Sequence, residues 1–333
     1  MREIRIRNEE SGQRLDKFLS RYLPEASSGF LYKMLRKKNI TVNREKADGN
    51  RLLQEGDCVT LFFSEETIAR FQDVASHPDE ASAARPLDAR QIVHEDAQVL
   101  IVNKPAGMLS QRATGKEQTL TEAILAYLEE TRGWDAAQWR LYKPGPINRL
   151  DRNTSGLVVV PLSLAAAQTL AGWFRDRALR KEYLTFVHGR WERESVQKAW
   201  LRRAGDERVS RVVFAPEEGA VPIEMHCRLL ASSSGKEEAS LLSVDLKTGK
   251  THQIRAHLQA LGNPVFGDPK YGTIQTPADR SLHRQALHAW RLTFPQTEGV
   301  LAALSGKQVC APLPDDLDKL RCRLQLPEID VRS

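Results

Sequence analysis

The apolar positions between residues 15 and 23 repeat with the i, i+3, i+4, i+7, i+8 spacing of an amphipathic helix. They are Leu15, Phe18, Leu19, Tyr22 and Leu23. Pro24 should end this helix, and Ser27 or Ser28 can cap a second one. Two short strands are expected next, around Ile40–Asn43 and Cys58–Phe63, so the pattern predicts a small α/β unit at this end of the chain.

From residue 91 onward the pattern changes to short runs of apolar and β-branched residues. We expect strands at Val99–Val102, Leu157–Val160, Tyr183–Val187, Val209–Phe214, Met225–Leu230 and Leu241–Leu246. Helical spacing occurs near Leu120–Glu130 and Ser163–Arg180. Because the strands are irregularly spaced and do not alternate strictly with helices, we predict an α+β domain on a mixed, mainly antiparallel sheet.

A segment with neither period separates these two regions. Residues 72–88, QDVASHPDEASAARPLD, are rich in Ala, Ser, Asp and Pro. Such a composition buries too little apolar surface to offset the entropy of ordering the chain. We therefore divide the chain into an N-terminal domain at residues 1–64, a linker at 65–90 and a larger domain at 91–325.

The composition is that of a folded protein, with 41% hydrophobic and 28% charged residues. The most apolar stretch, 156–167, is interrupted by Pro161 and Ser163 and falls short of the roughly 20 residues that span a bilayer. The first ten residues lack the apolar segment of a signal peptide. The four scattered cysteines suit thiols in a reducing compartment, so we expect a cytoplasmic protein.

The net charge of +6 is concentrated near the N-terminus. Residues 28–51 hold seven Lys and Arg against two Asp and Glu. Four of these cations, Lys33, Arg36, Lys37 and Lys38, lie on or just after the second predicted helix. Such a cluster is often only a solvated helix face. Because this one lies on a small unit with few competing acids, we favour a surface that contacts the phosphates of a polyanionic partner.

One polar segment, Pro146–Gly156, leads directly into a predicted strand, where a loop can present a reactive group. Asp151 lies there between Arg149 and Arg152, and opposite charges on both sides would keep its carboxylate ionised, as a nucleophile or base requires. From this segment alone, a turn in which Asp151 accepts backbone N–H groups is an equally good interpretation. An aspartyl-phosphate enzyme would also need a magnesium-binding acidic loop, which we do not find in the sequence.

A second polar segment places Tyr183 at the start of a strand, shortly after Arg180 and Lys181. In isolation this position favours a tyrosine with its ring in the core and its hydroxyl at the surface.

The third polar segment is Lys247–Leu258. Its Gly249-Lys250-Thr251 sequence lacks the earlier glycine of a phosphate-binding loop. His252 and His257 are five residues apart, so they do not share a helical face and a zinc site is not expected. Arg255 lies off the apolar helical stripe, where an arginine is usually solvated.

Five segments of the chain match, in order, the motifs of one enzyme family. Asn148–Gly156 is similar to H-R-L-D-x-x-T-S-G, the signature of the RluA family of pseudouridine synthases. Lys181–Tyr183 resembles the second motif of this family, and Thr248–His257 resembles its third. Val102–Gly107 and Gly267–Gly272 match further blocks of the family. Five motifs in this order are far more specific than any one of them.

The resemblance covers roughly residues 12–63 and 91–295. The N-terminal unit resembles the small RNA-binding module named after ribosomal small-subunit protein four, which precedes the catalytic domain in the RluC and RluD branch. The resemblance therefore implies a pseudouridine synthase catalytic domain on the mixed sheet, preceded by a small α/β RNA-binding domain.

The functional residues of the family can be placed on this chain one at a time. Asp151 matches the catalytic aspartate, and Arg255 matches the arginine that pairs with it. Tyr183 matches the tyrosine that stacks on the uracil and has been proposed to remove the proton from carbon 5. Arg149 is expected to help hold the extruded nucleotide. Asn148 stands where the family usually has His. Because the matching aspartate and arginine are present, we expect activity to survive, while RNA docking or base extrusion can differ.

We also expect substrate contacts from Lys104, which lies in the Val102–Gly107 block, and from the four N-terminal cations. The resemblance implies an isomerase that converts specific uridines to pseudouridine, most plausibly in large-subunit ribosomal RNA, with no cofactor and no metal. We expect RNA as the partner, no membrane contact and a monomer. The alternatives are a synthase acting on transfer RNA and an inactive RNA-binding ribosome-assembly factor.

Overall fold

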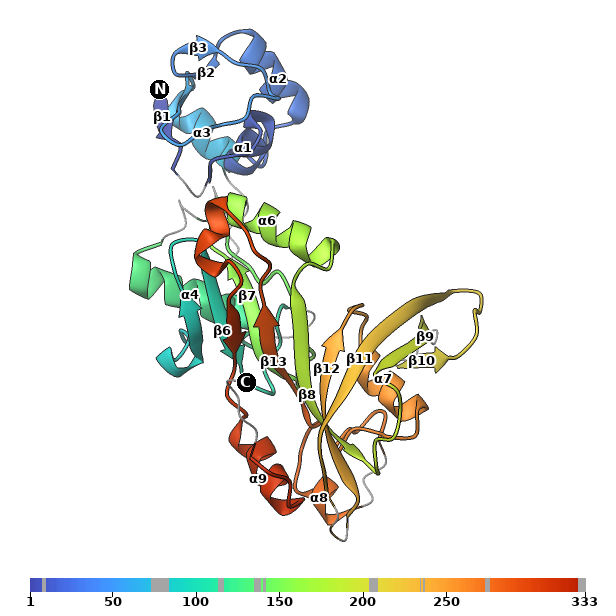
Figure 1. Ribbon diagram of the computed structural model, residues 1–333. Helices are drawn as coiled ribbons and strands as arrows, with labels where there is room; N and C mark the ends of the chain where they lie inside the picture. The colour runs from blue at the N-terminus through green and yellow to red at the C-terminus, as the bar shows by residue number, and fades with distance from the viewer. Residues whose placement is uncertain are drawn as a thin grey trace.

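The computed structural model describes residues 1–7, 10–72, 84–112, 117–134, 139, 142–203, 209–233, 235, 237–272 and 276–328. The chain forms two sheets, one in an N-terminal unit and one in a larger body (Figure 1). Of the segment expected to be a linker, residues 73–83 lie outside the described residues. Within the described ranges, no helix is both long enough and apolar enough to cross a membrane.

The N-terminal unit contains the two helices that the sequence pattern predicts. Its elements are β1 (Arg2–Arg5), α1 (Leu15–Tyr22), α2 (Ser28–Arg36), β2 (Ile40–Val42), β3 (Glu45–Lys46), β4 (Cys58–Leu61) and α3 (Glu65–Gln72). The strands form an antiparallel sheet in the order β1-β4-β2-β3. Ser27 caps α2, because its side chain accepts a hydrogen bond from the Phe30 N–H at 3.3 Å. Leu15, Phe18 and Leu31 are buried in a core that the helices share with the sheet.

The first unit extends beyond residue 64. Residues 65–72, assigned to the linker on their polar composition, form α3. Ile68 is fully buried in the N-terminal core, and the ring of Phe71 lies 4.8 Å from that of Phe30. Two apolar side chains three residues apart lie on one face and can dock a short polar helix. At the other end of the expected linker, Leu87 is buried in the core of the larger body.

The larger body is built on one ten-stranded sheet. Nine of its strands follow the order β10-β9-β11-β12-β8-β13-β7-β6-β5, and the tenth, β14, pairs with β13. Its strands are β5 (Ile92–Glu95), β6 (Val99–Lys104), β7 (Ser155–Pro161), β8 (Arg180–His188), β9 (Val196–Arg203), β10 (Ser210–Val213), β11 (Ala220–Ser233), β12 (Ala239–Leu246), β13 (Leu287–Thr293) and β14 (Gln308–Cys310). Among the strands described, β7 and β13 pair in parallel and the other pairs are antiparallel. The mixed, mainly antiparallel sheet is thus confirmed.

Helices cover both faces of the sheet at β6 and β7. The helical elements of the body are η2 (Ala89–Gln91), α4 (Leu120–Arg132), α6 (Leu164–Arg175), α7 (Gln253–Ala260), α8 (Pro277–Arg280), η3 (Gly299–Leu304) and α9 (Asp315–Arg323). Along β6, Val99 and Ile101 share a core with α6, whereas Leu100 and Val102 share a core with α4. Burial on both faces explains why these strands are continuously apolar.

Two features of the body differ from the sequence pattern. The helix expected over residues 163–180 ends at Arg175, because Arg177 adopts a left-handed conformation (φ 58°) and β8 begins at Arg180. The pattern also misses the strands β5, β9, β13 and β14. Of these, β13 has six buried residues in succession, among them His288 and Arg291. Polar side chains inside the protein remove the alternation by which strands are recognised in a sequence.

Gly156 marks the point where β7 passes closest to β13. Its φ is +117°, and a Cβ atom added there would lie 2.2 Å from the carbonyl oxygen of Ala289. No other residue fits this backbone without moving one of the two central strands. The contact therefore fixes the position of β7, and with it the loop that precedes the strand.

We predict that Gly156→Ala lowers the free energy of unfolding by about 2–3 kcal/mol, because the methyl group meets backbone and the conformation is strained. Gly172→Ala is the matched control. Gly172 lies inside α6, where an added Cβ would make only an ordinary contact at 3.8 Å, so this change should be neutral or stabilising by up to about 1 kcal/mol. Urea denaturation of both variants measures the difference, and equal midpoints would contradict the prediction.

Candidate active site

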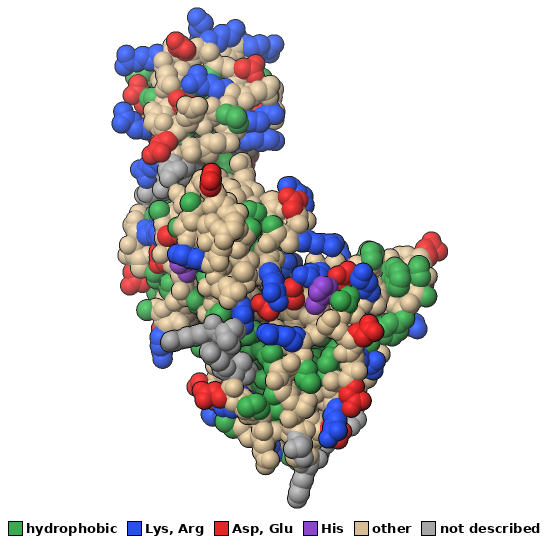
Figure 2. All heavy atoms as spheres, viewed as in Figure 1, with side chains coloured by type: hydrophobic (Ala, Val, Ile, Leu, Met, Phe, Trp, Pro, Cys, Tyr) green, Lys and Arg blue, Asp and Glu red, His purple; other side chains and the backbone are tan. Residues whose placement is uncertain are grey.

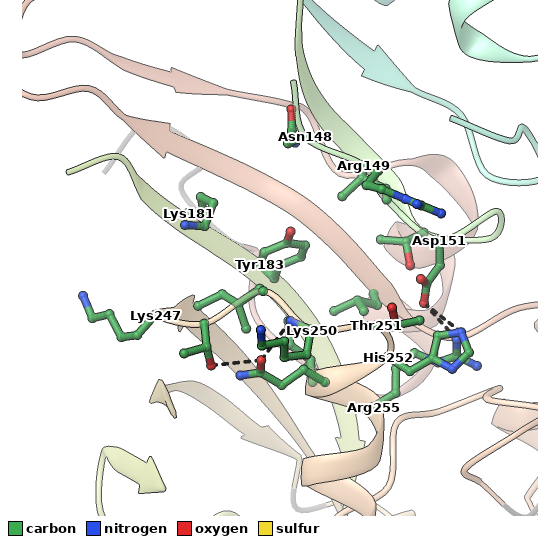
Figure 3. Close-up of a pocket in the computed structure, with 18 of the residues that line it drawn as sticks. Asn148, Arg149, Asp151, Lys181, Tyr183, Lys247, Lys250, Thr251, His252 and Arg255 are labelled. Atoms are coloured by element: carbon green, nitrogen blue, oxygen red, sulfur yellow. Dashed lines mark hydrogen bonds and ion pairs between the residues drawn. The ribbon is translucent and has the colours of Figure 1, made fainter. Parts of the chain in front are cut away.

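A cleft of about 710 Å³ lies where the loop before β7, the start of β8 and the start of α7 meet (Figure 3). It is lined by residues 147–151 of the loop, by residues of β8 and by residues 246–255 between β12 and α7. Arg149, Asp151, Tyr183 and Arg255 all line it. The fold thus brings together four residues that the family resemblance assigns to one site.

Asp151 presents its carboxylate to this cleft. Its Oδ2 accepts a hydrogen bond from Nη1 of Arg255 at 2.9 Å, and the side chain is 27% exposed. The turn around it is closed by the main chain, because the Asp151 carbonyl accepts the Thr154 N–H at 3.0 Å. Arg152, expected beside the carboxylate, pairs instead with Glu117. Arg255, and not the sequence neighbour Arg152, therefore supplies the opposite charge.

Arg255 is buried, so it is not the solvated arginine that its helical position alone would favour. Its side chain is 4% exposed, and its Nε and Nη2 each donate to the carboxylate of Asp268 at 2.7 Å. The guanidinium also lies 5.2 Å from the ring of Tyr271. Burial would lower the pKa of Arg255, but the hydrogen bonds and charge of Asp268, and then those of Asp151, raise it above its ordinary value. The arginine therefore stays charged between two carboxylates.

His252 is a further neighbour of Asp151. It caps α7 in a left-handed conformation (φ 58°), and its Nε2 lies 3.7 Å from Oδ2 of Asp151. Its Nδ1 lies 3.1 Å from the hydroxyl of Tyr271, which accepts the Ser210 N–H at 2.8 Å. Because that hydroxyl can then donate to Nδ1, the ring proton is placed on Nε2, facing Asp151. Burial lowers the pKa of His252, although Asp151 opposes this, so the ring is neutral at pH 7.

His252 and Asp268 are missing from the residues assigned from the sequence. Both lie within matched motifs, so the signal was the motif itself. Their roles depend on contacts that cannot be read from the motifs. Asp268 is fully buried against Arg255, which lies 13 residues away in the sequence. The carboxylate beside the His252 ring is that of Asp151, from another part of the chain.

Tyr183 lies on β8 and faces the cleft (Figure 3). Burial, and then the charge of Asp151, raise its pKa above the ordinary value of a tyrosine. The phenol therefore stays protonated at neutral pH, and its ring is available as an apolar surface beside Asp151.

Asn148 lines the cleft, but its amide group is used by the protein. Its Oδ1 accepts the Val159 N–H at 2.8 Å, and its Nδ2 donates to the Leu157 carbonyl at 3.2 Å. The side chain thus connects the loop to β7 through the hydrogen bonds that a neighbouring strand would otherwise make. The amide therefore also helps to place the loop, and its contact with substrate stays a prediction.

Lys104 does not reach the cleft, contrary to its expected contact with substrate. It is fully buried, and its Nζ donates to the carbonyls of Pro105, Met108 and Arg152 at 2.9–3.0 Å. Burial is the main cause that lowers its pKa, to about 7; the charge of Arg284 adds to this, and that of Asp151 opposes it. Lys104 therefore holds the backbone behind the site.

Lys and Arg side chains gather where the cleft opens, in the notch between the main body and the part formed by β9 to β11 (Figure 2). Besides the buried Arg255, the cations that line the cleft are Arg149, Arg177, Lys181, Lys247 and Lys250. Lys247 pairs with Asp245 at 2.7 Å. The other four make no ion pair with a carboxylate of the described residues. They give the entrance of the cleft a positive charge.

The four cations of the N-terminal unit do not belong to the cleft. Lys33 and Arg36 lie on α2, and Lys37 and Lys38 follow it. All four side chains are exposed, and none forms an ion pair within the part of the chain that is described. They form a separate positive surface.

Among the described residues, no three His, Cys, Asp or Glu side chains are grouped as the ligands of a metal ion. The four cysteines are free thiols.

Comparisons with known proteins identify relatives over nearly the whole chain. The sequence profile of the RNA pseudouridylate synthase family matches residues 98–260. The chain is 31% identical to ribosomal large subunit pseudouridine synthase D of Nitrosomonas europaea, over 96% of this chain and 86% of the relative. It is 30% identical to ribosomal large subunit pseudouridine synthase C of Escherichia coli O157:H7, over 97% and 96% of the two chains.

A solved structure supports the same fold. The human protein titled RNA pseudouridylate synthase domain containing 4 superposes with a TM-score of 0.57 at 21% identity. The match covers 72% of this chain and 94% of the human chain.

We predict that Arg255→Ala lowers the free energy of unfolding by about 3–5 kcal/mol, because it leaves the buried carboxylate of Asp268 without its counter-ion. Arg255→Lys keeps the charge but not the planar fork, so its stability should be intermediate. Arg177→Ala, which removes an exposed arginine of the same cleft, should change stability by no more than about 0.5 kcal/mol. Chemical denaturation of the three variants measures these effects. An Arg255→Ala protein as stable as Arg177→Ala would contradict the described role of the ion pair.

Proposed function

The chain belongs to the RNA pseudouridylate synthase family, and we propose that it isomerises specific uridines of large-subunit ribosomal RNA, with Asp151 as the catalytic carboxylate. The main support is the geometry of Asp151, which is open to a cleft and held by a buried arginine. The names of the relatives from Nitrosomonas europaea and Escherichia coli support ribosomal RNA as the substrate class.

The reaction needs a carboxylate beside the sugar and base of the target. The bond between uracil N1 and the ribose breaks, the base turns, and a bond forms between carbon 5 and the ribose; carbon 5 then loses a proton and N1 gains one. Asp151 can act as the nucleophile on the sugar, or it can stabilise the step in which a glycal forms. In both routes the carboxylate must be directed into the cleft, and the hydrogen bond from Arg255 holds it in that direction.

The target uridine must leave its stack to reach Asp151, which costs a few kcal/mol. Tyr183 offers a ring on which the extruded uracil can stack and so offsets part of this cost. Because its hydroxyl stays protonated, we assign Tyr183 this stacking role in preference to proton removal from carbon 5. The four unpaired cations at the entrance, Arg149 among them, are suited to the phosphates on either side of the target.

The N-terminal unit supplies affinity for RNA and takes no part in the chemistry. Its resemblance to the S4-type RNA-binding module and its exposed cations, Lys33, Arg36, Lys37 and Lys38, support this assignment. These cations lie on a different unit from Asp151, so they can hold RNA outside the cleft.

Two alternatives have less support. An inactive RNA-binding assembly factor would not need Asp151, Arg255 and Tyr183 to converge on one cleft, and Asn148, the departure that favours it, has a structural role. A synthase acting on transfer RNA would use the same site and is separated from our proposal only by the substrate.

We predict that Asp151→Asn abolishes pseudouridine formation, with a loss of at least about 10³-fold in rate, while RNA affinity and melting temperature stay close to those of the wild type. Tritium release from ribosomal RNA labelled at uracil carbon 5 measures the activity. Release at the wild-type rate would refute the role of Asp151. A parallel assay on labelled transfer RNA tests the alternative substrate.

We predict that Lys33→Gln/Lys37→Gln weakens RNA binding and makes it less dependent on salt. For every lysine that neutralises a phosphate, its replacement should reduce the slope of log K against log salt by about one unit. Lys307→Gln/Lys319→Gln removes the same charge from two exposed lysines of the body and serves as the control. If both double variants have the wild-type slope, the N-terminal surface does not bind phosphates.

A further inference from the structure

The loop that carries Asp151 has no regular secondary structure, yet its backbone is held throughout. Four successive carbonyl groups, those of residues 150–153, each accept a hydrogen bond at 3.0–3.2 Å. Their donors are, in order, Ser110 Oγ, the Thr154 N–H, Lys104 Nζ and Arg284 Nη1. Three of the four donors come from outside the loop, so its shape depends on the elements behind it.

Arg284 is the donor that reaches furthest along the sequence. It is 5% exposed and precedes β13, 131 residues after the loop. Its Nη1 donates to the carbonyl of Asn153 at 3.2 Å and also to that of Leu287, a residue that lines the cleft, at 3.3 Å. One guanidinium nitrogen thus joins the Asp151 loop to the start of β13.

The other two nitrogens of Arg284 are held by α9. Its Nε donates to Oδ2 of Asp316 at 2.6 Å, and its Nη2 donates to Oδ1 at 2.9 Å. Asp316 lies in the first turn of α9, and that helix is anchored in the core by Leu317 and Leu320. This bidentate pair fixes the plane of the guanidinium, and hence the direction of Nη1.

The residues that follow Arg284 continue the contact with the loop. Gln285 Nε2 donates to Oγ1 of Thr154 at 3.0 Å. The side chains of Ser155 and His288 meet at 2.9 Å, where β7 and β13 begin to pair. Residues 284–288 therefore contact residues 153–155 in order, up to the close approach of the two strands at Gly156.

We propose that Arg284 and Asp316 form a clamp through which α9 positions the Asp151 loop, so that Arg284 is a positioning residue of the reaction. The inference rests on the proposed role of Asp151. A lysine in place of Arg284 lacks the planar fork, so it cannot keep the bidentate pair with Asp316 while it also donates to Asn153. Without the clamp the loop backbone is free to shift, and a displacement of about 1 Å at a reacting group can cost as much as 10²-fold in rate.

Asp316→Asn tests the clamp against a matched control, Asp318→Asn. Both residues are acids in the first turn of α9, so both changes alter the helix terminus alike. Asp318 pairs with Arg321 at 2.7 Å on the same helix and has no contact with the loop. Arg284→Lys and Asp151→Asn complete the set.

The measurement is the single-turnover rate on an unmodified large-subunit ribosomal RNA transcript labelled at uracil carbon 5, with enzyme in excess and well below the melting temperatures. A variant that is only less stable lowers the amount of active enzyme, but not the rate constant at saturation. We expect Asp316→Asn and Arg284→Lys to lower this rate constant at least about tenfold with half-saturation unchanged, and Asp318→Asn to keep the wild-type rate.

Wild-type rates for both Asp316→Asn and Arg284→Lys would overturn the clamp, as would an equal loss in Asp318→Asn. A change in half-saturation alone would overturn it too, because it would place Arg284 in RNA binding. If Arg284→Lys does not fold, the comparison of Asp316→Asn with Asp318→Asn decides. An active Asp151→Asn protein would refute the proposed function instead, whatever the other variants do.

Discussion

One buried guanidinium holds two carboxylates, and the organisation of the site depends on how it is shared. Asp268 is fully buried and takes two hydrogen bonds from Arg255, which already neutralises the arginine. Asp151 takes the remaining Nη1 and stays 27% exposed. Of the two carboxylates, the accessible one is the one that faces the cleft. The same arrangement places a guanidinium beside Asp151 and leaves the second oxygen of its carboxylate open to the cleft.

The backbone carbonyls around Asp151 accept hydrogen bonds from side chains, whereas those of a strand accept them from the backbone of neighbouring strands. Lys104 and Arg284 are buried cations whose hydrogen bonds end on carbonyl oxygens of the loop. Behind them, β6 and β7 are packed between α4 and α6, so the strand that follows the loop cannot tilt. The Asp151 carboxylate, for which we propose the catalytic role, thus projects from irregular backbone whose carbonyl groups are held by side chains, and precise placement of a reactive group requires such support.

The parts of the structure that local spacing determines can be predicted from the sequence. The helices α1 and α2 follow from apolar positions on one face, and Asp151, Tyr183 and Arg255 follow from motifs that resemble a known family. Apart from the pair of Asp151 and Arg255, which the family resemblance implies, contacts between distant residues cannot be predicted in this way. Adjacency in the sequence favours Arg152 as the partner of Asp151, and nothing in the sequence around Lys104 reveals that it is buried. The pattern misses the polar helix α3 because its docking depends on a core formed by other elements.

The order of the site residues along the chain has a consequence for folding during translation. Asp151 meets Arg255 across 104 residues, and the loop meets Arg284 and Gln285 across 131. Contacts of such sequence separation form late, because the entropy of closing a long loop must be overcome first. The N-terminal core, by contrast, uses only residues 4–71 and can fold while the rest of the chain is still being translated. A growing polypeptide therefore has its positive N-terminal surface before the contacts that hold the Asp151 loop can form, because those contacts use residues as far along the chain as Asp316.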